Sequence, residues 1–196
     1  MNRDDTQALL AIPAILLVGV LLTLAGATGG ARLGTVPVFA ICAAWCFVVN
    51  WVVFVPSFLA RTEHFFDLAG SATYISVVLL AVYLTDRVDA RGLLLAALIL
   101  AWAGRLGTFL FLRVRREGKD GRFDAIKQSL PRFFMAWTLQ GLWVLVTAAC
   151  ALAAITAAAD VPLGAFAAAG GAMWLAGFAL EVTADRQKSA FKGDPA

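Results

Sequence analysis

One charged residue, Arg105, lies inside an apolar segment that extends from about Gly92 to Leu112. A charge inside a membrane span costs at least about 2.5 kcal/mol, and such residues commonly hold a carboxylate or a ligand anion. The alternative is an arginine whose side chain reaches along the lipid to the headgroups. In a helix, Arg105 would lie about 12 Å from Arg113, where the polar sequence begins. The first interpretation makes Arg105 a candidate catalytic residue.

A carboxylate opens the preceding apolar segment. Asp67 lies at the start of a run from about Phe65 to Leu84. An acid at this position either complements the dipole at the N-terminus of a helix or faces a cavity together with Arg105. His64, the only histidine, is interpreted as a surface residue. Asp67 is therefore the second candidate catalytic residue.

Charged side chains form a stripe near the end of the chain. Glu181, Asp185, Lys188 and Lys192 are spaced so that they share one face of a helix. The stripe is either a solvated face with ion pairs four residues apart or the wall of a polar cofactor pocket. In such a pocket, carboxylates accept hydrogen bonds from ribose or amide groups and lysines meet phosphate. The second interpretation makes Glu181, Asp185 and Lys192 candidate cofactor-binding residues, together with Arg113 at the start of a basic loop.

Apolar segments of membrane-spanning length account for most of the chain. Of its 196 residues, 61% are apolar and 15% are charged, whereas a soluble domain has about 25% charged residues. Only helices or closed barrels satisfy the backbone in lipid, and runs this continuous are helices. The sequence predicts a single all-α transmembrane domain over residues 1–196, without strands. Its six spans are expected at about 7–27, 36–60, 65–84, 92–112, 133–158 and 162–182.

The basic residues predict how the spans are oriented. With six spans, twelve Lys and Arg residues lie on one side of the membrane and three on the other, and Arg105 lies inside a span. This asymmetry predicts that both termini are cytoplasmic. It also predicts that Asp67, Arg105, the basic loop and the Glu181 stripe lie at one end of the bundle, where convergent polar groups would form a binding cavity. The basic residues lie in the connections between spans and not on a soluble face that could bind nucleic acid. The expected partners are therefore a lipid bilayer and a hydrophobic small molecule.

The cysteines do not form a metal-binding pattern. Cys42, Cys46 and Cys150 all lie within apolar segments. Cys42 and Cys46 are four residues apart, which is not C-x-x-C spacing, and there is no second Cys/His pair to complete a metal site. We expect three buried free thiols and no metal.

Several motifs resemble a known family. From about Phe66 onward the chain is similar to the bacterial relatives of the steroid 5-alpha-reductases, a group of membrane proteins catalogued as a domain of unknown function. The resemblance rests on Asp67-Leu-Ala-Gly-Ser, Gly104-Arg-Leu-Gly-Thr-Phe-Leu-Phe-Leu-Arg113, Gly118-Lys-Asp-Gly-Arg-Phe123, Leu139-Gln-Gly141, Gly177-Phe-Ala-Leu-Glu-Val-Thr-Ala-Asp-Arg-Gln187 and Phe191-Lys-Gly-Asp-Pro.

The resemblance implies a fold of seven to eight spans in the bacterial inner membrane and an NADPH-dependent reductase. Such an enzyme delivers a hydride to the carbon–carbon double bond of an enone lipid or a steroid-like substrate. By position, Asp185 resembles the family's cofactor-binding acid, and Glu181 and Lys192 fall at other cofactor contacts. Arg105 matches an arginine on the helix of the catalytic tyrosine, and Asp67 falls near the catalytic glutamate. These two residues would polarise or protonate the substrate carbonyl.

Two departures from the family pattern open alternatives. The position of the catalytic tyrosine, three residues before Arg105, is Trp102. The family's C-terminal Arg-His-Pro-Asn-Tyr-type motif and last span are also missing, so we expect a truncated member that binds NADPH poorly or not at all. One alternative is a membrane methyltransferase of the isoprenylcysteine type that uses S-adenosylmethionine. The other is a membrane protein that is not an enzyme.

Overall fold

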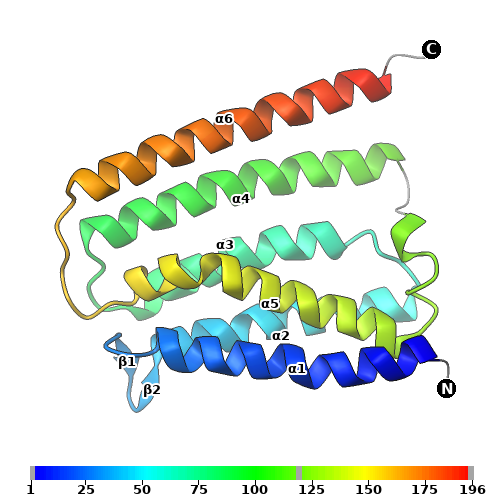
Figure 1. Ribbon diagram of the computed structural model, residues 1–196, viewed down its shortest axis with the longest axis horizontal. Helices are drawn as coiled ribbons and strands as arrows, with labels where there is room; N and C mark the ends of the chain where they lie inside the picture. The colour runs from blue at the N-terminus through cyan, green and yellow to red at the C-terminus, as the bar shows by residue number, and fades with distance from the viewer. Residues whose placement is uncertain (1–2, 118–120, 194–196) are drawn as a thin grey trace. The chain divides into compact units, whose positions relative to one another are not determined.

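The chain folds into long helices. A computed structural model describes residues 3–117 and 121–193, except for the side chains at 115–117, 122, 192 and 193. Among these residues, six helices are long and apolar enough to cross a membrane, so the chain is an all-α, multi-pass membrane protein, as predicted. The helices are α1 (Arg3–Gly26), α2 (Val38–Leu59), α3 (Phe66–Leu84), α4 (Ala90–Glu117), α5 (Leu130–Ile155) and α6 (Ala165–Gly193), with a 3-10 turn η1 (Gly121–Phe123) before α5 (Figure 1).

The chain divides into two compact units. Residues 1–160 hold α1 to α5, and residues 161–196 hold α6. Every predicted span corresponds to one helix, but α4 and α6 extend well beyond the apolar segments. The reason is that backbone hydrogen bonds continue a helix through polar residues such as Arg113 and Asp185 once the apolar part has formed.

A short hairpin contradicts the prediction that the chain has no strands. Strands β1 (Arg32–Leu33) and β2 (Val36–Pro37) pair antiparallel between α1 and α2. Gly34 in the turn has a φ of 60°, a conformation that glycine adopts without steric cost. Two-residue strands are too short to show the alternation that predicts a strand.

Helix α5 lies at the centre of the first unit and contacts each of α1, α2, α3 and α4. Its N-terminus is defined by Ser129, whose hydroxyl accepts a hydrogen bond from the backbone N–H of Arg132, and by a proline in the first turn. Inside the bundle, Trp51 Nε1 on α2 donates to Thr138 Oγ1 on α5 at 3.1 Å. Such bonds between helices add to packing where lipid supplies no hydrophobic driving force.

The expected burial of the thiols is only partly confirmed. Cys42 and Cys46 on α2 are fully buried, but Cys150 on α5 is exposed. An apolar segment in a membrane shows which residues tolerate lipid, but it does not show which of them face neighbouring helices.

Gly141 allows α2 and α5 to pack closely, and its substitution gives a first prediction. A Cβ at this position would lie 3.0 Å from the Cys46 carbonyl oxygen and 3.2 Å from Phe47 Cα. We expect Gly141→Ala to lower the free energy of unfolding by about 1–3 kcal/mol, because the α2 backbone must move away. Thermal unfolding in detergent micelles measures this. Gly177→Ala is the control, since its Cβ would meet no atom within 4 Å, and equal melting temperatures for both variants would contradict the prediction.

The charged end of the first unit is where α1 and α5 begin and α2 ends. Arg132 Nε on α5 lies 3.3 Å from Asp5 Oδ1 on α1, and the Arg61 guanidinium, just after α2, donates to the Lys127 and Gln128 carbonyls. These contacts confirm that the N-terminus, the α2–α3 connection and the α4–α5 connection lie together. Their cytoplasmic location stays a prediction.

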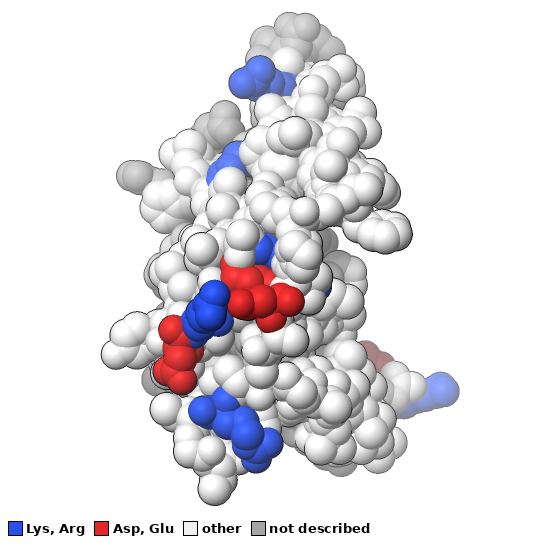
Figure 2. Space-filling model, turned by 90° about the vertical axis from the view of Figure 1, so that its left-hand side faces the viewer, with Lys and Arg blue, Asp and Glu red and all other residues white. Residues whose placement is uncertain are grey.

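The opposite end of the first unit carries the β1–β2 hairpin, at the left of Figure 1. Figure 2 faces this end and shows Lys, Arg, Asp and Glu in small patches on a largely uncharged surface. Two of these charges form an exposed ion pair, Arg87 Nη2 with Asp160 Oδ2 at 3.2 Å. An exposed pair of this kind contributes about 0–1 kcal/mol, so it adds little to the stability of this end.

Candidate functional site

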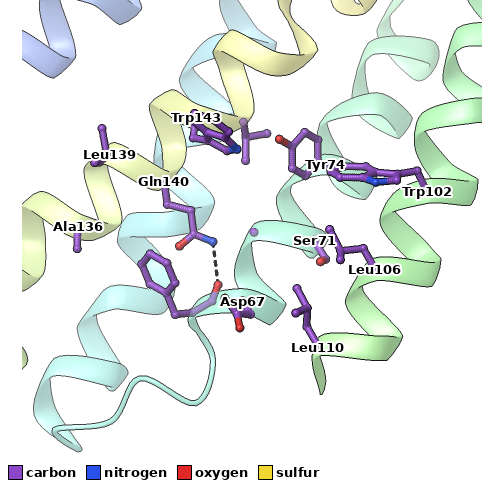
Figure 3. A pocket seen from close by; sticks show the side chains of 13 residues that line it. Asp67, Ser71, Tyr74, Trp102, Leu106, Leu110, Ala136, Leu139, Gln140 and Trp143 are labelled. Atoms are coloured by element: carbon purple, nitrogen blue, oxygen red, sulfur yellow. Dashed lines mark hydrogen bonds between the residues drawn. The ribbon is translucent and has the colours of Figure 1, made fainter. Parts of the chain in front are cut away.

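A cavity of about 440 Å³ lies between α3, α4 and α5. Most of its wall is apolar or aromatic. Asp67, Ser71, Tyr74 and Gln140 bring carboxylate, hydroxyl or amide groups to it (Figure 3). A mostly apolar cavity with a few convergent polar groups is typical of a small-molecule site. The complete lining is Phe66, Asp67, Gly70, Ser71, Tyr74, Trp102, Leu106, Leu110, Ala136, Leu139, Gln140, Trp143 and Val144.

One face of α3 supplies three of the four polar groups. Asp67, Ser71 and Tyr74 recur at helical spacing, so they project to the same side of the helix. Ser71 is 5% exposed, and its hydroxyl has no hydrogen-bond partner in the part of the chain that the structure describes. Opposite it, Gly107 on α4 has no side chain, and a Cβ there would lie 2.8 Å from Ser71 Cβ. The glycine therefore lets α4 approach the hydroxyl-bearing face of α3.

The fourth polar group, Gln140, comes from α5. Its Nε2 donates to the Phe66 carbonyl at 2.8 Å (Figure 3). Its Oε1 is buried and finds no partner among the described residues. A Cβ on Gly70 would collide with Gln140 Nε2, so glycine at position 70 is what allows this side chain to lie against α3. The amide is thus fixed in orientation at the wall of the cavity.

Asp67 forms an ion pair with Arg113, and not with Arg105. Arg113 Nη2 lies 2.9 Å from Asp67 Oδ2, and about a quarter of each side chain is exposed. An unpaired charge is costly in an apolar surrounding, and the ion pair with Arg113 offsets this cost for the Asp67 carboxylate. At the cavity wall its oxygens can accept hydrogen bonds from a bound group. The predicted cofactor role of Arg113 stays a prediction.

Arg105 does not line this cavity. It is partly exposed on α4, with its guanidinium carbon 5.7 Å from the centroid of the Phe109 ring. Leu106 and Leu110, which do line the cavity, mark a different face of α4. The structure therefore brings together Asp67 and Arg113, not Asp67 and Arg105, and the catalytic role of Arg105 stays a prediction.

The predicted cofactor residues of the last helix lie in the second unit. Glu181 and Asp185 are both partly exposed and lie four residues apart on α6, which runs without interruption to Gly193. The Lys192 backbone is helical, and its side chain lies outside the described part of the chain. The shared helix face that the sequence predicted is therefore present for the two carboxylates.

Tyr74 lines the cavity and was not among the site residues predicted from the sequence. Its ring packs edge-on against Trp102, with 5.0 Å between the ring centroids, and its hydroxyl lies 2.5 Å from Thr147 Oγ1 on α5. Trp102 occupies the position where the resemblance implies a tyrosine, and the structure places another tyrosine directly beside it. The seven-residue spacing from Asp67 was visible in the sequence, but the contact with α4 was not.

Comparison with known proteins identifies the family. The family model described as a protein of unknown function, DUF1295, matches residues 53–196. The match includes every residue that lines the cavity and every candidate site residue from Asp67 to Lys192. No curated protein and no solved structure matches the chain. With most of its length covered by the family model, the chain belongs to the DUF1295 family, the 5-alpha-reductase-like membrane group.

Proposed function

We propose that the protein is an NADPH-dependent reductase of the carbon–carbon double bond in an enone lipid. The observation that carries this proposal is the apolar cavity between α3, α4 and α5, whose hydroxyl and amide groups can hold one carbonyl oxygen. Membership of the 5-alpha-reductase-like group supports the type of reaction. The lipid character of the substrate follows from the apolar wall of a cavity in a membrane-spanning bundle.

The cavity can stabilise the charge that this reaction creates. As the β-carbon of an enone gains a hydride, the electrons of the double bond move toward the carbonyl oxygen, and a proton must be supplied to complete the reduction. Hydroxyl donors aimed at that oxygen stabilise the developing charge. Among the described residues the Ser71 hydroxyl has no hydrogen-bond partner, and the Tyr74 phenol lines the same cavity, so we assign carbonyl binding to Ser71 and proton supply to Tyr74.

Thr147 prepares Tyr74 for this role. The Thr147 hydroxyl donates to the Trp143 carbonyl at 2.7 Å, so in this arrangement it accepts the phenolic proton of Tyr74. A substrate carbonyl oxygen that reaches Tyr74 would replace Thr147 as the acceptor of that proton. Asp67, held by its ion pair with Arg113, would orient the substrate.

The carboxylates of α6 suit the proposed cofactor. Two acceptors four residues apart on one helix face match the hydroxyl and amide donors of a dinucleotide. NADPH, when bound, supplies the hydride, and Glu181, Asp185 and Lys192 are the residues that would hold it. Arg113 already binds Asp67, so we place it with the substrate cavity.

Cofactor titration of the purified protein in lipid nanodiscs tests the proposal. NADPH at a hundred times its Kd should stabilise the fold by about 2.7 kcal/mol, and adding a long-chain enone should start NADPH oxidation. Asp185→Ala should weaken NADPH binding, whereas Gln187→Ala, on an exposed part of the same helix, should not. Stabilisation by S-adenosylmethionine instead would indicate the methyltransferase, and no response to either cofactor would indicate a protein that is not an enzyme.

A further inference from the structure

A second, smaller cavity adjoins the first. It has a volume of about 280 Å³ and is lined by Tyr74, Ile99, Trp102, Trp143, Thr147 and Ala148. Ile99 precedes Trp102 on α4, and Ala148 follows Trp143 on α5, so this cavity lies farther from the charged end. We name the larger cavity the proximal chamber and the smaller one the distal chamber.

Three aromatic side chains separate the chambers. Tyr74, Trp102 and Trp143 line both, and Figure 3 shows them together at the end of the proximal chamber opposite Asp67. We name these three residues the aromatic partition. Within it, Tyr74 packs edge-on against Trp102, and the Tyr74 hydroxyl forms a 2.5 Å hydrogen bond with Thr147.

We propose that the distal chamber binds the apolar end of an unbranched hydrocarbon chain whose polar group occupies the proximal chamber. The nature of that polar group, an enone carbonyl, rests on the function proposed above. The proposal assigns the substrate to the straight-chain lipids and not to fused-ring compounds.

The polar groups are distributed as this ligand requires. Asp67, Ser71 and Gln140 line only the proximal chamber. In the distal chamber, the hydroxyls of Tyr74 and Thr147 bond to each other, and Thr147 also bonds to a backbone carbonyl. The remaining distal wall is hydrocarbon and indole, so this chamber favours a ligand segment without polar atoms.

The shape of the site also favours a chain. From Leu110 to Ile99, the two chambers extend over about 16 Å of α4 at 1.5 Å per residue. A single hydrocarbon chain can pass the aromatic partition by small rotations of its side chains, whereas a fused ring system would have to separate Tyr74 from both Trp102 and Thr147.

The hydrocarbon chain of the ligand can enter the site from the lipid. Leu139 and Trp143 on α5 line the proximal chamber, and they are 49% and 64% exposed. The chamber is therefore open along this side of α5, between its polar end and the aromatic partition. A lipid that enters there can place its head beside Ser71 and its tail beyond Trp102.

Photo-crosslinking tests the proposal without any turnover. The probes are straight-chain α,β-unsaturated ketones with a hexyl or a dodecyl chain, each carrying a diazirine at the chain terminus. In nanodiscs, the long probe should label Ile99 or Ala148, and the short probe should label residues of the proximal chamber. Excess unlabelled ketone should compete with both.

A substitution that fills the distal chamber tests the proposal most directly. Ile99→Phe should reduce long-probe labelling at Ala148 by at least about tenfold, which corresponds to 1.4 kcal/mol, within the range of overpacking costs. The matched control, Ala97→Phe, adds the same ring to an exposed position of α4 outside both chambers and should leave labelling unchanged.

The outcomes separate this inference from the proposed function. Long-probe labelling confined to lipid-facing residues such as Val146, or unaffected by Ile99→Phe, overturns the distal site even if NADPH oxidation is observed. Labelling of the distal chamber without any NADPH response keeps the chain-binding site and removes the reductase.

Discussion

Tyr74→Phe should lower the rate of enone reduction by about a hundredfold or more, since a positioned proton donor contributes about 10²–10⁴ to a rate. The substitution removes only the phenolic hydroxyl, and the ring remains packed against Trp102. Stability should fall by about 1 kcal/mol for the lost hydrogen bond to Thr147. NADPH oxidation under saturating cofactor measures the rate, and thermal unfolding measures the stability.

The chain offers a matched control, because it contains only one other tyrosine. Tyr83 lies on the same helix and is 84% exposed, so Tyr83→Phe should leave the rate unchanged. Tyr74→Phe should bind NADPH as tightly as the parent protein, because the lost group acts on the substrate. A Tyr74→Phe rate equal to that of Tyr83→Phe would remove Tyr74 from the mechanism.

Lys127→Met should destabilise the charged end by about 3 kcal/mol, the cost of removing one partner from a largely buried ion pair. Lys127 Nζ lies 2.8 Å from Glu63 Oε2, and their side chains are 15% and 4% exposed. The same ammonium lies 3.0 Å from Asp124 Oδ1. It therefore joins the α2–α3 connection to the segment that leads into α5. Unfolding in detergent, followed by tryptophan fluorescence, measures the difference in unfolding free energy between the parent protein and Lys127→Met.

A second substitution shows whether the loss comes from charge. Glu63→Gln combined with Lys127→Met should recover much of the stability. The amide that replaces the Glu63 carboxylate carries no charge, so the loss of the Lys127 ammonium costs it less. Lys188→Met, which changes an exposed lysine of α6, should have little effect. A double variant as unstable as Lys127→Met would show that packing, and not charge, holds this connection.

The stability from Lys127 should depend on pH. The hydrogen bonds to Glu63 and then to Asp124 raise the pKa of Lys127 above its ordinary value. A raised folded-state pKa gives stability that is fully present below the unfolded-state pKa, about 10.4, and is lost as the pH rises through the folded value. The stability difference between the parent protein and Lys127→Met should therefore be constant near neutral pH and shrink above about pH 10.4.

The sequence by itself determined the number, order and approximate bounds of the spans. Segments such as Phe65–Leu84 had to be helical, since lipid leaves no other way to satisfy the backbone. The distribution of Lys and Arg also predicted which connections share one end, and the contact of Arg132 with Asp5 bears this out. Both properties depend on local composition, which can be read directly along the chain.

The tertiary structure decided which side chains meet. Asp67 and Tyr74 share a face of α3 by spacing alone, but only packing shows that this face meets Trp102 on α4 and Gln140 on α5. Arg113 binds Asp67, whereas Arg105 lies on a different face of α4. An apolar helix in lipid carries little periodic signal, because its lipid-facing and buried sides are equally hydrophobic. The rotation of each helix about its axis, and with it the composition of the site, is therefore fixed by contacts between helices.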